Sequence, residues 1–342
     1  MPKELICPEP GKLAWRTYEE REPGVGEVRV RCEFAAAKHG TEMAIFKGYA
    51  NARGRFDGEY KLHVPGRSIF SYPASLGNMA VGRVEAVGAA VTRVGAGDRV
   101  CVHAGFRETC HIDEKECWRI PDDVSWKSAV CLDPADFALA AVRDGHVRLG
   151  DAVAVFGLGA IGLVVVQLAG LAGAYPVVGV DPLENRRHVA EKFGASASID
   201  PRECDTGLEL KKLTGKRGVD VAIEYSGSAD GLQQALRGVA FGGTVVAGAY
   251  PPPYGPGLDF GAEAHWNIPN LVFSRACSEP NRDYPRWDEK RIYGVCRRLI
   301  EEGEIKGEDI VEPVVAFDDL LEEYPKIATN PEENIKLGVK FE

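Results

Sequence analysis

The chain of 342 residues lacks the features that mark membrane-spanning or secreted proteins. Its longest apolar stretch, residues 160–174, is interrupted by Gln167 and by glycines and is shorter than the roughly 20 residues that cross a bilayer. The N-terminus does not show the basic and apolar pattern of a signal peptide, and the nine cysteines are scattered without close pairs. We therefore expect a cytoplasmic protein with free thiols and no membrane partner.

A basic excess is lacking as well, because 51 acidic and 41 basic side chains give a formal net charge of -10. Such a surface repels phosphate backbones, so nucleic acid is not an expected partner. The hydrophobic content of 45% and the charged content of 27% are those of an ordinary folded protein. At this length a single core stops growing, which predicts two domains.

The first 130 residues alternate short β-rich runs with turns that contain glycine. The expected strands are residues 27–34, 81–87, 98–103 and 110–112. This pattern predicts a compact antiparallel barrel.

From Asp151 onward, apolar strands alternate with helices. We expect strands at 152–156, 177–180, 219–223, 244–247 and 271–274, and helices at 160–172, 185–193 and 229–239. This order predicts a doubly wound parallel sheet, with the proline-rich residues 251–257 as a loop at its carboxyl edge. Further helices are expected at 287–302 and 318–327, and a last strand at 336–341.

A glycine motif follows directly on the first strand of this sheet. The motif is Gly157-Leu158-Gly159-Ala160-Ile161-Gly162. Gly157 allows a tight turn, Gly159 lets the backbone approach a pyrophosphate, and Gly162 permits close packing of helix on strand. A strand before the motif and a helix after it are the context that a dinucleotide site requires.

Asp181 ends the next strand, where a carboxylate accepts hydrogen bonds from the adenosine ribose and repels the extra phosphate of NADP. We therefore expect NAD as the cofactor. Arg186 and Arg187 follow, and an arginine there can clamp a 2′-phosphate, but we give Asp181 more weight and place Arg186 beside the adenine or on a solvated helix face. Ser226 is assigned to the same cofactor site. The alternative is that the glycines serve only turns and that Asp181 only caps a helix.

These motifs resemble the zinc-type medium-chain dehydrogenases, and the likeness covers nearly the whole chain. It extends to Gly82-Arg83-Val84-Glu85-Ala86-Val87-Gly88, Gly97-Asp98-Arg99-Val100, Leu132-Asp133-Pro134 and Asn334-Ile335-Lys336. The resemblance implies an α/β protein with a GroES-like β-barrel catalytic domain at 1–136 and 278–342 and a Rossmann NAD-binding domain at 137–277. It also implies that Lys336 reaches the cofactor pyrophosphate and that the chain forms a homo-oligomer, a dimer or tetramer.

The sequence departs from this family at the zinc ligands. The family holds its catalytic zinc by a Cys in Cys-Gly-Thr/Ser-Asp/Glu, a His in Gly-His-Glu, and a Cys or Glu near the linking helix. The corresponding residues here are His39, Asn78 and Asp133. Asparagine is a poor zinc ligand, so we expect no metal.

Without zinc, the proton of a substrate hydroxyl must pass to a side chain in the same pocket. The candidates are His39, Lys38 and Asp133, with Thr41 as a relay hydroxyl. Histidine titrates nearest neutrality, which favours His39 as the base. The alternatives are a barrel histidine bonded to a backbone carbonyl and, for Lys38, a solvated charge at a strand end.

The segment 48–72 is rich in hydrogen-bonding side chains and either covers the cleft or forms a surface loop. These side chains are Tyr49, Arg53, Arg55, Tyr60, His63, Arg67 and Tyr72. Trp266, Tyr284 and Trp287 offer flat surfaces for a sugar, or pack at the sheet edge or in a subunit contact. We expect an NAD-dependent dehydrogenase of a small polyhydroxylated substrate, such as a sugar or cyclitol. An enzyme that retains NAD for epimerisation or elimination, and a non-catalytic NAD-binding sensor, remain open as alternatives.

Overall fold

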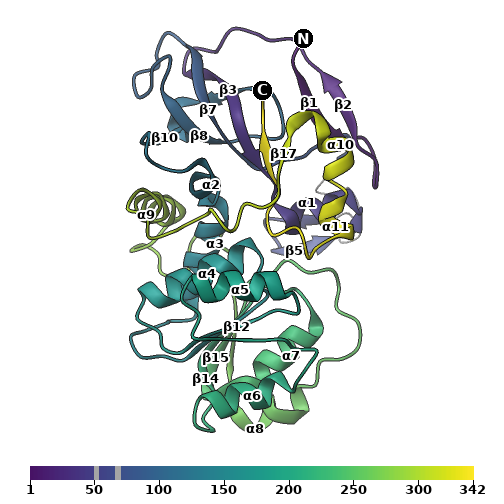
Figure 1. Cartoon of the computed structure of the whole chain (residues 1–342), viewed down its shortest axis with the longest axis vertical. Helices are drawn as coiled ribbons and strands as arrows, with labels where there is room; N and C mark the ends of the chain where they lie inside the picture. The colour runs from purple at the N-terminus through teal and green to yellow at the C-terminus, as the bar shows by residue number, and fades with distance from the viewer. Residues whose placement is uncertain (50–53, 66–70) are drawn as a thin grey trace. The chain divides into compact units, whose positions relative to one another are not determined.

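The computed structural model describes residues 1–49, 54–65 and 71–342. The chain folds into two compact units, Met1–Val130 with Val311–Glu342, and Cys131–Ile310. Figure 1 shows both ends of the chain in the first unit. The domain boundaries predicted after residues 136 and 277 therefore differ from those of the two units. Residues 131–136 and 278–310 belong to the second unit because α3 (Leu132–Asp144) and α9 (Glu289–Glu301) pack against each other there.

The first unit is built on a mainly antiparallel sheet. In spatial order its strands are β10 (Trp118–Arg119), β8 (Arg99–His103), β7 (Met79–Val87), β3 (Glu27–Ala36), β18 (Gly338–Lys340) and β17 (Val314–Ala316), and β9 (Thr109–Asp113) also pairs with β3. Along β3, the alternate residues Val28, Val30 and Cys32 are buried, as expected for a sheet with one face on a core. The C-terminal strand β18 pairs with β3 and so brings the end of the chain beside residues 34–36.

Smaller elements complete the first unit. They are the sheet of β2 (Ala14–Thr17), β1 (Lys3–Cys7) and β6 (Ala74–Ser75), the hairpin of β4 (Arg55–Asp57) and β5 (Leu62–Val64), and the helices α1 (His39–Phe46), α2 (Trp126–Ala129), α10 (Leu320–Glu323) and α11 (Lys326–Thr329). The prediction of one helix at 318–327 is wrong. Pro325 separates α10 from α11, because proline has no amide hydrogen to continue a helix.

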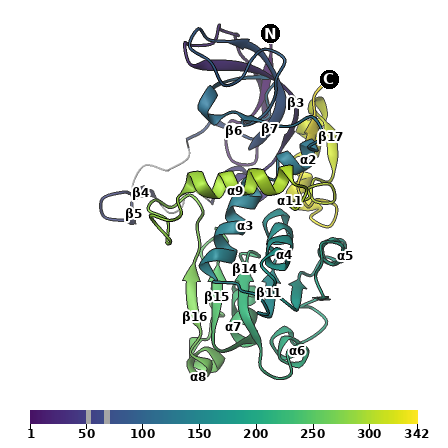
Figure 2. The same cartoon turned by 90° about the vertical axis from the view of Figure 1, so that its left-hand side faces the viewer.

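The second unit contains a six-stranded parallel sheet. In spatial order its strands are β13 (Ala197–Ile199), β12 (Val177–Val180), β11 (Val153–Phe156), β14 (Val219–Glu224), β15 (Val239–Ala247) and β16 (Asn270–Phe273). Figure 2 shows β16, β15, β14 and β11 in succession. The chain adds strands to one side of β11 and then to the other, so the strand order reverses at β11, where ligands bind in such sheets. The predicted Rossmann sheet is confirmed.

Helices cover this sheet, which explains its apolar strands. The helices are α4 (Ala160–Leu171), α5 (Glu184–Lys192), α6 (Thr206–Leu213), α7 (Ala229–Gly238) and the short α8 (His265–Asn267), besides α3 and α9. In β11 the residues Ala154 and Phe156 pack in one cluster with Leu210 of α6 and Leu232 of α7. All four residues of β11 are buried, as in strands covered on both faces. Among the helices of the described residues, none has the length and apolarity needed to cross a membrane.

Candidate active site

The glycine motif forms the turn between β11 and α4. Gly157 has a φ of +84°, and a Cβ there would lie 2.4 Å from the backbone nitrogen of Ser226, so the position requires glycine. A Cβ on Gly162 would lie 2.0 Å from the carbonyl oxygen of Gly157, so the helix packs directly on the turn. A Cβ on Gly159, by contrast, would meet no described atom within 4 Å. Open space therefore lies at the N-terminus of α4, where backbone amides can bind a phosphate.

The other residues of the motif lie in the same turn and at the start of α4. Leu158 is fully buried in the turn, whereas Ala160 and Ile161 are half-buried in the first turn of α4. The residues present thus fit a dinucleotide, whose pyrophosphate the glycine turn would bind. Direct contact of each residue with the cofactor stays a prediction.

Asp181 lies directly after β12 and is 3% exposed. Its Oδ2 accepts a hydrogen bond from the amide of Leu158 at 2.8 Å, and its Oδ1 accepts one from the amide of Leu183 at 2.8 Å. The carboxylate therefore ties the glycine turn to the end of β12, a role that the sequence did not reveal. The Arg186 guanidinium lies 3.8 Å from the same carboxylate, and burial lowers the pKa of Arg186 below its usual range. Arg186 thus lies beside Asp181 at the predicted ribose end of the site.

Ser226 lies after β14 and is held by a carboxylate that sequence reasoning missed. Its hydroxyl donates a hydrogen bond to Oε1 of Glu224, which also accepts one from the amide of Gly227 at 2.9 Å. Glu224 is fully buried, and this burial raises the pKa of its carboxyl. The sequence signal that could have revealed Glu224 is a charged residue at the end of an otherwise apolar strand.

In the first unit, the predicted catalytic side chains lie on one segment. Lys38 is the N-cap of α1, His39 is its first residue, and Thr41 lies half-buried in its first turn. The Nε2 of His39 accepts a hydrogen bond from the amide of Leu337 at 2.8 Å. A neutral histidine with Nε2 as acceptor carries its proton on Nδ1. In this form the ring can donate a hydrogen bond through Nδ1–H, while the Nε2 lone pair that would accept a proton is used by Leu337, which argues against the predicted role of His39 as the base while that bond is intact.

Lys336 is buried in the first unit, with 2% of its surface exposed. Its Nζ donates a hydrogen bond to the carbonyl oxygen of Ala37 at 2.5 Å, and the amide of Ala37 donates one to the carbonyl of Leu337 at 3.0 Å. These bonds extend the pairing of β18 with β3. The ammonium is thus used on the backbone of its own unit, and its contact with a cofactor pyrophosphate stays a prediction.

Asp133 belongs to the second unit, so the structure does not place it in one unit with His39. It is the second residue of α3 and is 4% exposed, and Asp136 lies one turn further along the helix. Burial and the carboxylates of Asp136 and Asp133 raise the pKa of Tyr293, which places this α9 side chain close to both. The role of Asp133 as a proton acceptor stays a prediction.

The donor set does not fit a zinc ion. The Nε2 lone pair of His39 is used by a backbone amide, and the side chain of Asn78 is an amide. Glu42, the carboxylate nearest to His39 in the sequence, already accepts three hydrogen bonds. Within residues 1–49, 54–65 and 71–342, no three or more His, Cys, Asp or Glu side chains are grouped so that they could hold a metal.

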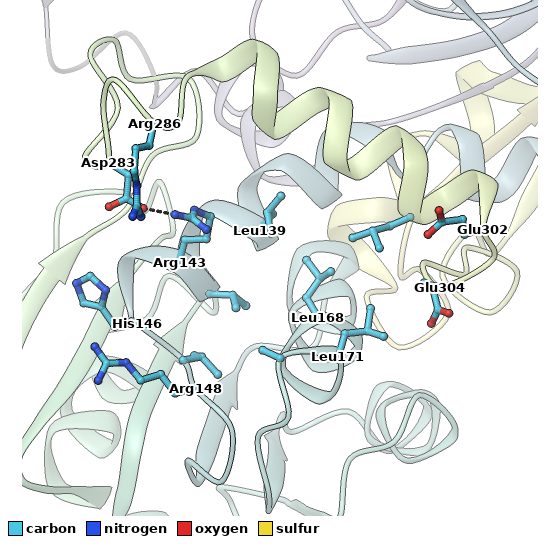
Figure 3. Close-up of a pocket in the computed structure, with 14 residues that line it drawn as sticks. Leu139, Arg143, His146, Arg148, Leu168, Leu171, Asp283, Arg286, Glu302 and Glu304 are labelled. Atoms are coloured by element: carbon cyan, nitrogen blue, oxygen red, sulfur yellow. Dashed lines mark hydrogen bonds and ion pairs between the residues drawn. The ribbon is translucent and has the colours of Figure 1, made fainter.

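A cavity of about 660 Å³ lies elsewhere in the second unit (Figure 3). Its walls include the basic Arg143, His146, Arg148 and Arg286, the aliphatic Leu139, Leu168 and Leu171, and the acidic Glu302 and Glu304. The cavity lies at the C-terminal ends of α3 and α4, and therefore near the amino edge of the sheet, opposite the glycine turn. Arg143 already pairs with Asp283 and lies 3.6 Å from the ring centre of Trp287. This cavity is therefore not the cofactor site.

The residues predicted to line a substrate cleft are dispersed. Tyr60 is exposed between β4 and β5, whereas the hydroxyl of Tyr72 donates a hydrogen bond to the carbonyl of Ile45. Arg53 and Arg67 lie outside the described residues. Trp266 and Tyr284 are exposed, and Trp287 lies against two guanidinium groups, those of Arg143 and Arg291.

Comparison with known proteins identifies the family. Residues 24–124 match the alcohol dehydrogenase GroES-like domain, and residues 160–268 match the zinc-binding dehydrogenase family. The D-guloside 3-dehydrogenase of Escherichia coli (strain K12) is 44% identical over 349 residues, which cover 99% of this chain and 100% of that protein. The chain therefore belongs to the medium-chain dehydrogenase/reductase superfamily.

Solved structures share the fold. The 2R,3R-butanediol dehydrogenase of Bacillus subtilis has a TM-score of 0.79 at 23% identity, over 99% of each chain. A putative zinc-binding dehydrogenase of Sinorhizobium meliloti 1021 bound to NADP has a TM-score of 0.80 at 22% identity, over 99% of each chain. The GroES-like and Rossmann architecture is thereby confirmed. The chain is an oxidoreductase of this superfamily, for which a nicotinamide dinucleotide is the expected cofactor.

Proposed function

We propose that this protein is an NAD-dependent dehydrogenase that oxidises a secondary hydroxyl of a sugar or related polyol without zinc. The open space at Gly159, at the N-terminus of α4 and next to the buried Asp181, is the observation that carries the proposal. The full-length relative named D-guloside 3-dehydrogenase supports a hexose glycoside as substrate and its 3-hydroxyl as the reacting group. The reaction turns the alcohol into a ketone, transfers a hydride to NAD and releases one proton.

The residues of this chain divide the work between cofactor and substrate. Gly157, Gly159 and Gly162 shape the pyrophosphate site, and Asp181 faces the adenosine ribose. On the substrate side, Nδ1–H of His39 donates a hydrogen bond to the reacting oxygen, which fixes the hydroxyl for hydride transfer. Lys38, in its neutral amine form, accepts the proton and becomes an ammonium.

Two further groups complete the substrate side of this proposal. Thr41 relays the proton toward Lys38, and Asp133 is the alternative acceptor. His39 becomes the base only if its bond to Leu337 opens. Lys38→Met and Asp133→Asn separate the two acceptors, because the variant that lacks the true acceptor should lose kcat and the rise of its rate with pH.

The deciding experiment supplies the purified protein with NAD and a panel of methyl hexosides, free hexoses and cyclitols while the absorbance of NADH is followed. We expect one NADH for each ketone formed, with a D-guloside among the active compounds. An epimer or elimination product without released NADH would favour an enzyme that retains its cofactor. NAD binding without turnover of any compound would favour a sensor, and either result would overturn the proposed dehydrogenase.

The metal-free part of the proposal has its own measurement. Elemental analysis should find well under one zinc per chain, and a chelator should leave NADH formation unchanged. Near-stoichiometric zinc, with activity lost to the chelator and restored by zinc, would return the enzyme to Lewis-acid catalysis.

A further inference from the structure

Glu42 is a buried carboxylate in the first unit, 4% exposed, with both oxygens used. Its Oε1 accepts a hydrogen bond from the backbone amide of Lys38. Its Oε2 accepts one from the amide of Gly77 at 3.0 Å and one from the hydroxyl of Tyr324 at 2.8 Å. Burial raises the pKa of Glu42, whereas these three donors and the nearby Lys336 lower it.

The three donors belong to three segments far apart in the sequence. Lys38 caps α1, Gly77 lies in the turn before β7, and Tyr324 follows α10. Two of the three segments, those of Gly77 and Tyr324, are tightly packed. Gly77 has a φ of +94°, and a Cβ there would lie 2.4 Å from the amide nitrogen of Phe106. The Tyr324 ring is fully buried and packs edge-on against Phe46 and Phe106.

Two of these segments carry the positions at which the related zinc enzymes are expected to hold their metal. His39 follows Lys38, and Asn78 follows Gly77. A metal ion bound by both segments would hold them together, but here the donor set does not fit one. The Glu42 carboxylate makes the connection by hydrogen bonds, and Lys336, whose ammonium binds Ala37 just before Lys38, adds a buried positive charge.

We propose that Glu42 is a positioning residue that, with Tyr324 and Lys336, fixes Lys38 and His39 for the reaction, as a metal ion would otherwise do. This inference rests on the proposed function, because it assumes that Lys38 and His39 act on the substrate. Glu42 itself touches neither substrate nor cofactor. A carboxylate that accepts several charge-assisted hydrogen bonds can set such a segment, and small displacements of reacting groups lower rates strongly.

The first test replaces Glu42 by glutamine, which keeps the size of the side chain but turns one acceptor oxygen into a donor. Glu42→Gln should lower kcat about tenfold or more and leave the Kd of NAD within about twofold of wild type. Tyr324→Phe removes one hydrogen bond and keeps the buried ring, so kcat should fall less. The double variant should lower kcat by a smaller factor than the product of the two single effects, because both changes act through one carboxylate.

The matched control is Glu114→Gln. Glu114 also accepts two backbone hydrogen bonds, from the amides of Thr92 and Arg93 at 2.8 and 2.7 Å, but it is only half-buried. Its variant should keep the wild-type kcat and KM. If Glu42→Gln lowers the melting temperature while the folded enzyme keeps its kcat, Glu42 is purely structural and the proposal is overturned.

A second readout does not depend on activity. Amide protons that bond to a carboxylate resonate downfield, so the NMR signals of Lys38 and Gly77 should move upfield in Glu42→Gln and the signal of Gly77 should move slightly in Tyr324→Phe. Unchanged amide signals would overturn the inference. If wild-type protein oxidises no sugar, the proposed function fails, whereas an active wild type with an equally active Glu42→Gln refutes the positioning role alone.

Discussion

Among the described residues, several buried carboxylates accept hydrogen bonds from backbone amides, and three of them fix a turn or a helix start beside the proposed site. Asp181 holds the glycine turn, Glu42 holds the start of α1, and Glu224 holds the turn after β14. Carboxylates are costly to bury unless donors surround them. Their burial therefore shows where the backbone must keep one conformation, and all three positions adjoin residues that we assign to cofactor or substrate.

We predict that the wild-type protein binds NAD about tenfold more tightly than NADP, or better, a difference of about 1.4 kcal/mol. The reason is the charge of Asp181, which repels a 2′-phosphate. Asp181→Asn should lower the ratio of the Kd of NADP to the Kd of NAD, as measured by calorimetry. The asparagine keeps one oxygen that can accept the hydrogen bond from the amide of Leu158. The control Glu184→Gln, at an exposed position of α5, should leave the ratio unchanged. Equal affinities in the wild type would show that the nearby Arg186 governs the choice.

Glu224 gives a prediction about pH and stability. Its pKa is raised in the folded protein, so the native state binds this proton more tightly than the unfolded chain does. The contribution of the protonated Glu224 to the stability of the folded protein is complete below pH 4.5, the pKa of the carboxyl in the unfolded chain. This contribution is lost as the pH rises through the pKa of Glu224 in the folded protein. The free energy of unfolding of wild type relative to Glu224→Gln should therefore fall as pH rises above 4.5. Chemical denaturation of both proteins at several pH values measures this difference, and a constant difference would show that Glu224 titrates normally.

At the scale of elements, the β11–α4 turn can be tested as a unit. A side chain at Gly159 meets open space, so Gly159→Val should leave the melting temperature within a few degrees of wild type but abolish NAD binding, because its methyl groups fill the pyrophosphate position. Gly170→Val, on the same helix and also without a described atom near its Cβ, should bind NAD normally. Calorimetry with NAD and thermal unfolding check both variants. A folded Gly159→Val protein that keeps its NAD affinity would remove the turn from the cofactor site.

Helices, strands and turns that depend on residues close together in the sequence could be predicted. The strand at 152–156, the glycine turn and the following helix agree closely with β11 and α4, because apolar runs and glycine spacing act within a few residues. The contact of Tyr324 with Glu42 spans 282 residues, and no periodicity encodes it. The same holds for the bond of Leu337 to His39, which argues against the role predicted for that histidine. The likeness to the zinc enzymes indicated which residues to consider for the site, whereas the hydrogen bonds that these residues make are seen only in the structure.

At the scale of the whole molecule, the predicted domain boundaries show a related limit. The sequence assigned residues 278–310 to the barrel, but the amphipathic helix α9 lies on α3 in the second unit. Its buried residues Ile292, Cys296 and Ile300 form one helical stripe, which the sequence shows clearly. A stripe indicates that a helix is covered, but not by which element.

The second unit leaves one sheet edge with large apolar side chains exposed. The edge strand β16 carries Phe273, which is 70% exposed, and the preceding residues include Trp266 at 77% and Ile268 at 61%. Exposed edge strands and aromatic surface are ready sites for association, and an edge pairs most simply with the same edge of a second copy. We therefore propose that two copies of this chain associate through β16, which would give the expected homo-oligomer a specific interface.

Phe273→Glu should separate the two copies, because the two-fold symmetry of such a contact places two like charges close together in an apolar interface. We expect the dissociation constant to rise about 100-fold or more, which is about 2.8 kcal/mol at 1.4 kcal/mol per tenfold. The control is Leu149→Glu, an 87% exposed residue before the interior strand β11, which should leave association unchanged. Analytical ultracentrifugation over a range of concentrations measures all three proteins. A wild type that stays monomeric at every concentration, or a Phe273→Glu protein that associates as the wild type does, would place the contact elsewhere or remove it.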